Sequence, residues 1–261
     1  MPEATAPEPQ SKRIVFKELR DWGALVTSII AVTVSTCAFL NSNSAQESAA
    51  ETNKRSIRLE ANQYLYEAWD LLGGQAVAVV DFTNDERTLL EAHRLIQQAL
   101  VIDPNNPRAH RRSGQYLHAI GDFRPAIIEL TMAVELEKSS EPTDSRALSA
   151  TLVSLGNALL DQSRAEGKDY KILDKAIRIY EEALQLEVSL HSAKIYNNLG
   201  NAWSEHGEFD KAEEAYRKAI ALSPDLRSAY RNLGILYRRL SKHKEAEQIF
   251  SRLKALEPPE L

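Results

Sequence analysis

The chain has 261 residues, with 32 basic and 37 acidic side chains and a formal net charge of −5. Its 10 Gly, 10 Pro and single Cys exclude a collagen, a Pro/Gly-rich disordered chain and a disulfide-stapled secreted scaffold. The mild negative charge argues against a nucleic-acid partner, whose phosphates require a basic field.

The N-terminus predicts a membrane anchor. Residues 1–21 form a predicted disordered flank that starts with MPEATAPEPQ and ends in a basic stretch. Residues 22–40, WGALVTSIIAVTVSTCAFL, contain no charge, and a helix of this length spans about 28 Å, close to the thickness of a bilayer core. Because the basic residues precede the span, we expect a single-pass protein with a cytoplasmic N-terminus. In a bacterium, this topology predicts an inner-membrane protein with its remainder in the periplasm.

Three alternatives to an anchor are open for this segment. The first alternative is a buried core helix. The second is cleavage near Ser44 or Ala45, after which the remainder is secreted, and the third is cleavage with lipidation at Cys37. The apolar residues occur all around the helix, which favours a span over a core helix with one apolar stripe. Residues 41–59 follow as a polar spacer.

From residue 60 to 261 the chain repeats itself. YNNLGNAWSEHGEFDKAEEAYRKAIALSP, from Tyr196, aligns with YRNLGILYRRLSKHKEAEQIFSRLKALEP, from Tyr230, in a register of 34 residues. Within the first copy, Tyr196, Leu199, Gly200 and Trp203 form one apolar stripe at helical spacing. Breaks at Gly207 and Pro224 end the helices and predict a helix hairpin.

These residues resemble the tetratricopeptide repeat, whose pattern is W-x2-L-G-x2-Y…A-x3-F…P over 34 residues. The matching residues are Tyr196, Leu199, Gly200, Trp203, Ala212, Tyr216 and Pro224, and then Tyr230, Leu233, Gly234, Tyr237, Ala246, Phe250 and Pro258. A third unit around Gly156 has its second half eight residues late, with a charged insert between its helices. A fourth unit lies around Gly114, and a degenerate first unit runs from Tyr64 to Pro104 with an insert at 73–87.

The resemblance implies an all-α fold, a right-handed α-solenoid of four to five helix hairpins preceded by the transmembrane helix. The last hairpin carries Ile249, Phe250, Leu253 and Leu256 with no polar capping helix after it. This apolar end predicts self-assembly into a homo-oligomer, unless Glu257 to Glu260 blunt it sufficiently.

The first helix of each repeat offers a polar, partly basic face. In proteins of this family that face is typically concave and binds ligands. The candidate peptide-binding residues are Arg108, Arg111, Arg112, Asn157, Lys194, Asn197, Asn198, Asn201, Arg231, Asn232 and Arg239. Asparagine amides suit a peptide backbone and arginines suit carboxylates, so we expect an acidic or C-terminal segment as ligand. A solvated polar face is the alternative interpretation.

The face resembles the two-carboxylate clamps of some family members only in part. Asn157 and Asn198 match the clamp asparagines, whereas Val153, Ser228 and Asn232 stand where basic residues are expected. This departure argues against binding of a chaperone tail.

No constellation of residues predicts catalysis. The six His residues are scattered, the sole Cys lies in the predicted span, and Gly73-Gly74 lacks the rest of a phosphate loop. We therefore expect no metal, no cofactor and no enzymatic activity. The sequence predicts a membrane-anchored adaptor or scaffold that binds a protein partner, with self-assembly or a cleaved, secreted or lipidated protein as alternatives.

Overall fold

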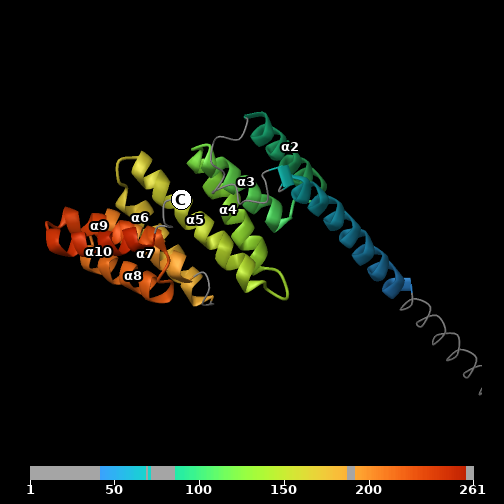
Figure 1. Cartoon of the computed structure of the whole chain (residues 1–261). Helices are drawn as coiled ribbons and strands as arrows, with labels where there is room; N and C mark the ends of the chain where they lie inside the picture. Colours follow the sequence, from blue (N-terminus) through green and yellow to red (C-terminus); the bar gives the residue numbers. More distant parts are fainter. Residues whose placement is uncertain (1–41, 69, 72–85, 187–191, 257–261) are drawn as a thin grey trace, which may run out of the picture. The chain divides into compact units, whose positions relative to one another are not determined.

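The computed structural model describes residues 42–68, 70–71, 86–186 and 192–256. All regular structure in these residues is helical, which confirms the predicted all-α class (Figure 1). The chain separates into two compact units, residues 1–57 and 58–261.

In the first unit, residues 42–57 are helical, and the side chains of 42–56 are all exposed. Local contacts support this polar helix: the Thr52 hydroxyl donates to the Ser48 carbonyl at 2.8 Å, and Arg55 pairs with Glu51. None of the described helices has both the length and the apolar character needed to cross a membrane. The predicted span at 22–40 lies outside the described residues.

The second unit begins with a degenerate hairpin. Residues 58–68 are helical, and α2 runs from Glu86 to Ile102. The two helices share an apolar cluster that contains Ala61, Leu65 and Ala68 on one side and Ala92, Leu95, Ile96 and Ala99 on the other. The insert predicted inside this unit lies largely at 72–85, outside the described residues.

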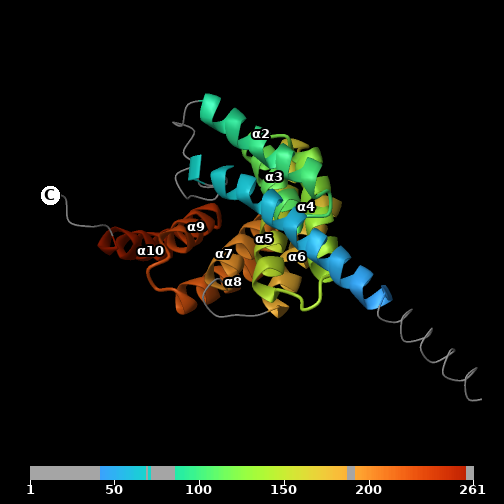
Figure 2. The ribbon, with the colours of Figure 1, turned by 90° about the vertical axis from the view of Figure 1, so that its right-hand side faces the viewer.

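Four more hairpins follow, each made of an A helix and a B helix. The A helices are α3 (Pro107–Ala119), α5 (Ser145–Ala165), α7 (Ser192–His206) and α9 (Arg227–Arg239). The B helices are α4 (Phe123–Lys138), α6 (Tyr170–Gln185), α8 (Phe209–Leu222) and α10 (His243–Ala255). Each B helix α4, α6 and α8 contacts the next A helix, and successive A helices contact one another. This unit is therefore a helical solenoid (Figure 2).

Short polar side chains cap the starts of α3, α5 and α6. The Asn106 side chain accepts from the backbone N–H groups of Arg108 and Ala109 at 3.1 and 3.2 Å, and Pro107 supplies the first helical residue of α3. Asp144 and Asp169 cap α5 and α6 in the same way. These caps satisfy backbone donors that would otherwise have no partner in the helix.

Each hairpin closes around a glycine of its A helix. A Cβ added to Gly200 would lie 2.6 Å from the ring of Tyr216 on the B helix, so only glycine permits this approach. Gly114, Gly156 and Gly234 face Leu130, Tyr180 and Phe250 in the same way. The central cluster of buried residues spans α4 to α7, and the partly buried Leu117 and Trp203 connect it to the clusters before and after it. The core is therefore continuous along the solenoid.

The extra residues that delay the second half of the third unit are mostly helical. The sequence predicts a charged insert between the helices, but α5 continues to Ala165 and α6 already begins at Tyr170. Both helices extend beyond the ends seen in α7 and α8, so only residues 166–169 connect them. The correction has a local cause: Asp169 caps α6, and Gly167 and Lys168 adopt positive φ in the turn.

Candidate binding surface on the A helices

Polar side chains join each A helix to the next. We call this set the A-face: the residues at fixed positions around the A-helix glycines of α3, α5, α7 and α9. Two residues before the glycine stand Arg112, Ser154, Asn198 and Asn232, and one residue after it stand Gln115, Asn157, Asn201 and Ile235. Because the repeats stack in register, residues at equivalent positions lie beside one another on neighbouring helices.

The centre of the A-face is an unbroken chain of asparagines. Asn198 Nδ2 donates to Asn157 Oδ1 at 2.9 Å, which connects α7 to α5. Asn197 Nδ2 donates to Asn198 Oδ1 at 3.4 Å, and Asn232 Nδ2 donates to both Asn197 Oδ1 and Asn201 Oδ1 at 3.0 and 2.9 Å. The structure therefore brings together all five asparagines that the sequence predicts.

Two buried tyrosines orient this asparagine chain from beneath. Tyr180 donates its hydroxyl to Asn157 Oδ1 at 2.7 Å, and Tyr216 donates to Asn201 Oδ1 at 2.8 Å. Burial raises the pKa of both phenols, so both remain donors at any ordinary pH. Among the described residues, no partner occupies Nδ2 of Asn157 and Asn201 or Oδ1 of Asn232. The A-face thus keeps both donors and acceptors for a ligand.

The upstream part of the A-face contains Arg112. Its Nη1 donates to Gln115 Oε1 at 3.1 Å, and Gln115 Nε2 donates to the Ser154 hydroxyl oxygen at 2.9 Å, which connects α3 to α5. Burial, together with the positive charges of Arg111 and Arg108, lowers the pKa of Arg112 to about 10. Positive charge is therefore concentrated at this end of the A-face.

Arg111 lies apart from this surface, although the sequence groups it with Arg108 and Arg112. Its side chain is 14% exposed, and Nη1 lies 3.4 Å from Glu137 Oε1 and 3.1 Å from the Ala147 carbonyl oxygen. Burial lowers the pKa of Arg111, although the charge of Glu137 opposes this effect. Arg111 therefore binds α4 and α5 to α3, and its guanidinium is already occupied.

The remaining predicted cations are exposed. Arg108 lies against Tyr66, with Nη1 3.5 Å from the tyrosine hydroxyl. Arg239 donates to the Ser204 carbonyl at 3.3 Å and its guanidinium lies 4.6 Å from the centre of the Phe209 ring. Lys194 and Arg231 are exposed, and neither has a hydrogen bond or an ion pair to another described residue.

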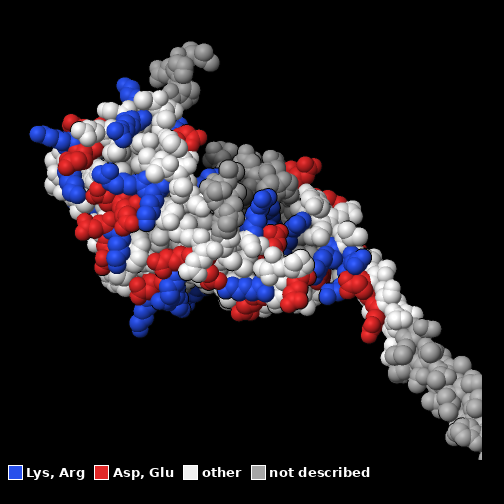
Figure 3. Space-filling view, turned by 90° about the horizontal axis from the view of Figure 1, so that it is seen from below, with Lys and Arg blue, Asp and Glu red and all other residues white. Residues whose placement is uncertain are grey.

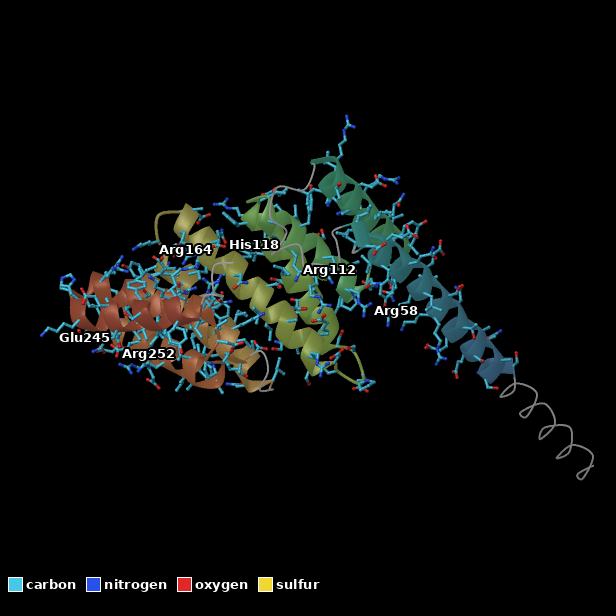
Figure 4. All side chains as sticks on the ribbon, in the orientation of Figure 1. Arg58, Arg112, His118, Arg164, Glu245 and Arg252 are labelled. Carbon is cyan, nitrogen blue, oxygen red and sulfur yellow. The ribbon has the colours of Figure 1, made fainter. Side chains whose placement is uncertain are left out.

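A second set of inter-helix contacts, absent from the sequence prediction, lies near the C-terminal ends of the A helices. His118 Nε2 lies 2.9 Å from Asp161, Asp161 lies 2.8 Å from Arg164 Nη1, and Arg164 Nε lies 3.4 Å from Glu205. We call these four residues the charged row; Figure 4 labels two of them, His118 and Arg164. The sequence does contain a signal for this row, because Asp161 and Glu205 both stand five residues after the glycine of their repeat.

The electrostatics of the charged row are dominated by Asp161. Burial raises the pKa of this carboxyl, but the hydrogen bond from His118 and the charge of Arg164 outweigh burial, so the pKa lies below its ordinary value. The carboxylate is therefore ionised near neutral pH and connects α3, α5 and, through Arg164, α7.

The apolar side chains of the last hairpin are partly covered within the chain. Phe250 fills the space beside Gly234, and the Arg238 guanidinium covers its ring at 4.3 Å. Ile249, Leu253 and Leu256 are partly buried. No side chain of the described part of α10 is an exposed large hydrophobic residue.

No group of three metal-ligating side chains occurs within the residues that the structure describes. Acidic and basic side chains are interspersed over the face shown in Figure 3.

Comparison with known proteins identifies a tetratricopeptide repeat at residues 193–226, which contain most of α7 and all of α8. Among solved structures, the thermophilic TPR protein TTC0263 of Thermus thermophilus is 19% identical, with a TM-score of 0.57 over 77% of this chain and 93% of that chain. A crystal structure of MamA is 26% identical, with a TM-score of 0.52 over 66% of this chain and 90% of that chain. At these identities the comparison supports a common solenoid fold.

Several curated relatives match shorter stretches of this chain. Human protein O-mannosyl-transferase TMTC3 is 34% identical over 73 residues, which are 28% of this chain and 8% of that protein. Photosystem I assembly protein Ycf3 of Synechococcus sp. (strain CC9605) is 33% identical over 72 residues, 27% of this chain and 42% of that protein. This chain thus spans less than a tenth of the length of TMTC3, and the match to the mannosyl-transferases lies in the repeats.

Proposed function

We propose that this chain, a tetratricopeptide-repeat protein, is a membrane-anchored scaffold that binds an extended segment of a protein partner along its A-face and catalyses no reaction itself. The observation that carries this proposal is the asparagine chain. Nδ2 of Asn157 and Asn201 and Oδ1 of Asn232 are without partners among the described residues. A peptide backbone offers alternating N–H and C=O groups, which match such amides.

The cations beside the asparagines favour an acidic or C-terminal segment as the ligand. Arg108 and Arg231 are exposed, and neither has an ion pair to another described residue. An arginine fork binds a carboxylate through two parallel hydrogen bonds. No transferase activity is proposed, since the match to the mannosyl-transferases covers only their repeats.

Site-specific photo-cross-linking from the full chain in its native membrane tests the A-face. A benzophenone amino acid at Lys194, which is exposed on α7, should cross-link a discrete partner protein. The same probe at Arg178, which is exposed on the B helix α6, is the matched control. Identical products from both positions, or none from Lys194, would contradict the proposal.

The anchor is proposed from the charge-free stretch at 22–40, with the N-terminus in the cytoplasm and, in a bacterium, the repeats in the periplasm. The full chain should remain in the membrane pellet after alkaline carbonate extraction. Replacing Ile29 and Ile30 by Lys should release it, because each charge at the centre of a span costs about 2.5–3.5 kcal/mol. Extraction of the unaltered chain would reject the anchor, and mass spectrometry of its N-terminus separates cleavage or lipidation at Cys37 from an intact span.

A further inference from the structure

Besides Lys194, the predicted cations on and beside the A-face lie in two groups on different helices. Arg108 and Arg112 are one turn apart near the start of α3, and Arg231 and Arg239 are two turns apart on α9. Between them, α5 and α7 present Ser154 and the asparagine chain, which are uncharged, with Lys194 at the start of α7. Between a basic group at each end, the A-face thus has a hydrogen-bonding centre of uncharged side chains with the single cation Lys194 beside it.

The segment that contains α9 and α10 has a net positive charge, whereas the chain as a whole is negative. Residues 227–256 contain eight Lys or Arg and two Glu, a net charge of +6, whereas the whole chain has −5. Of these cations, Lys242 pairs with Glu213, and Arg238 and Arg239 lie over aromatic rings. Arg231 has no acidic partner among the described residues. The charge of this end therefore complements an acidic ligand.

The α9 end also exposes one apolar side chain. Ile235 is 53% exposed and occupies the position that Asn157 and Asn201 hold in the two preceding A helices. It lies one helical turn from both Arg231 and Arg239. An apolar side chain flanked by arginines suits a ligand residue that is apolar and adjacent to a carboxylate.

The helix spacing sets the distance between the two basic groups. Three helix-to-helix steps separate α3 from α9, and packed helices lie about 8–10 Å apart, so the groups are roughly 25–30 Å apart. An extended chain advances about 3.3 Å per residue, so about eight or nine residues cover this distance.

We propose that the ligand is a bipartite acidic segment: two clusters of Asp or Glu separated by about eight or nine residues, with an apolar residue next to the cluster that binds α9. This inference rests on the proposed function and specifies its ligand. A single terminal carboxylate needs one basic group, whereas the chain provides two.

Synthetic peptides test the spacing directly. Fluorescein-labelled peptides with two Asp-Asp clusters, separated by three, nine or fifteen Gly/Ser residues and carrying Leu beside one cluster, are titrated with the full chain in neutral detergent micelles. We expect the nine-residue spacer to bind at least about tenfold more tightly than either single cluster or the three-residue spacer, because the second contact becomes intramolecular. A fifteen-residue spacer should lose part of that gain.

Charge-reversal variants identify the two ends. Arg108→Glu and Arg231→Glu should each reduce the affinity of the nine-residue peptide to that of a single cluster, and Ile235→Ser should remove the preference for Leu. Arg178→Glu, on the exposed surface of α6, changes the net charge equally and should leave the spacing dependence intact.

Three outcomes would overturn the inference: affinity that follows total charge but not spacing, spacing dependence that survives Arg231→Glu, or stronger Arg231-dependent binding to phosphatidylglycerol vesicles than to any peptide. The Lys194 cross-link separates these failures from that of the proposed function. If the cross-link persists while peptide spacing has no effect, the bipartite ligand is wrong and the protein-binding scaffold stands.

Discussion

Turns between A and B helices contain residues with positive φ. Gly207 holds this position in the hairpin of α7 and α8, with φ of 95°, and its N–H donates to the Trp203 carbonyl at 3.0 Å. One repeat period later stands Ser241, with φ of 57°. A side chain in this left-handed region contacts its own carbonyl oxygen, which costs about 1–2 kcal/mol relative to glycine.

Replacing Ser241 by Gly should therefore stabilise the protein. We expect a gain of about 0.5–1 kcal/mol in the free energy of unfolding, because the relieved strain exceeds the extra entropy of glycine in the unfolded chain. Urea denaturation followed by circular dichroism measures this difference. Ser251→Gly, within α10, is the matched control and should destabilise; a loss of stability in Ser241→Gly would show that the turn is not strained.

Helix-to-helix contacts combine apolar packing with a few buried polar groups. Glu137, near the end of α4, is buried; Arg111 approaches its Oε1, whereas Oε2 has no partner among the described residues. Burial raises the pKa of Glu137, although the hydrogen bond from Thr151 and the charge of Arg111 oppose it. This pair therefore fixes how α3, α4 and α5 meet, at a cost in desolvation.

Removing one member of this pair should harm the fold more than removing both. Arg111→Met leaves a buried carboxylate without its cation and should lower the free energy of unfolding by about 3 kcal/mol. Arg111→Met with Glu137→Leu should recover most of that loss, because well-packed apolar side chains replace a buried ion pair at little cost. Additive losses in urea denaturation would indicate that the two side chains do not interact.

The charged row predicts a dependence of stability on pH. Because the pKa of Asp161 is lowered in the folded state, its contribution is present above the ordinary Asp value of 3.8 and is lost as the pH falls through the lowered pKa. The stability difference between the parent and Asp161→Asn should be largest near about pH 7 and shrink towards about pH 3. A difference that is constant with pH would exclude an ionised Asp161.

Protection of the backbone amides from hydrogen exchange should differ along the chain, because buried apolar side chains are distributed unevenly along it. Residues 42–56 have no buried side chain, whereas the central cluster spans α4 to α7 and connects to its neighbours through Leu117 and Trp203. In a solenoid each repeat is stabilised mainly by its neighbours.

We therefore expect native-state hydrogen exchange to be fastest in residues 42–56 and slowest in α5 to α7. Mass spectrometry of peptic fragments from the full chain resolves these segments. Equal protection of 42–56 and α5 would mean that the N-terminal helix is covered by another surface.

The sequence by itself determined the repeat, its helix hairpins and the asparagines of the A-face, because period, glycine position and apolar spacing are local properties that each repeat restates. Seven matching positions in each of two copies were sufficient to place α7 to α10. The same reasoning missed that most of the insert in the third unit is helical and that only residues 166–169 connect α5 to α6, since helix length there depends on the Asp169 cap and on the turn geometry.

Only the tertiary structure decided what each polar side chain does. Arg111 and Arg112 are adjacent in sequence, yet Arg111 pairs with the buried Glu137, whereas Arg112 donates a hydrogen bond to Gln115 on the A-face. The five asparagines form one hydrogen-bonded chain, and Asp161 joins His118 to Arg164. Most of these partners lie on different helices, and a hydrogen bond depends on ångström distances that the helical period alone does not specify.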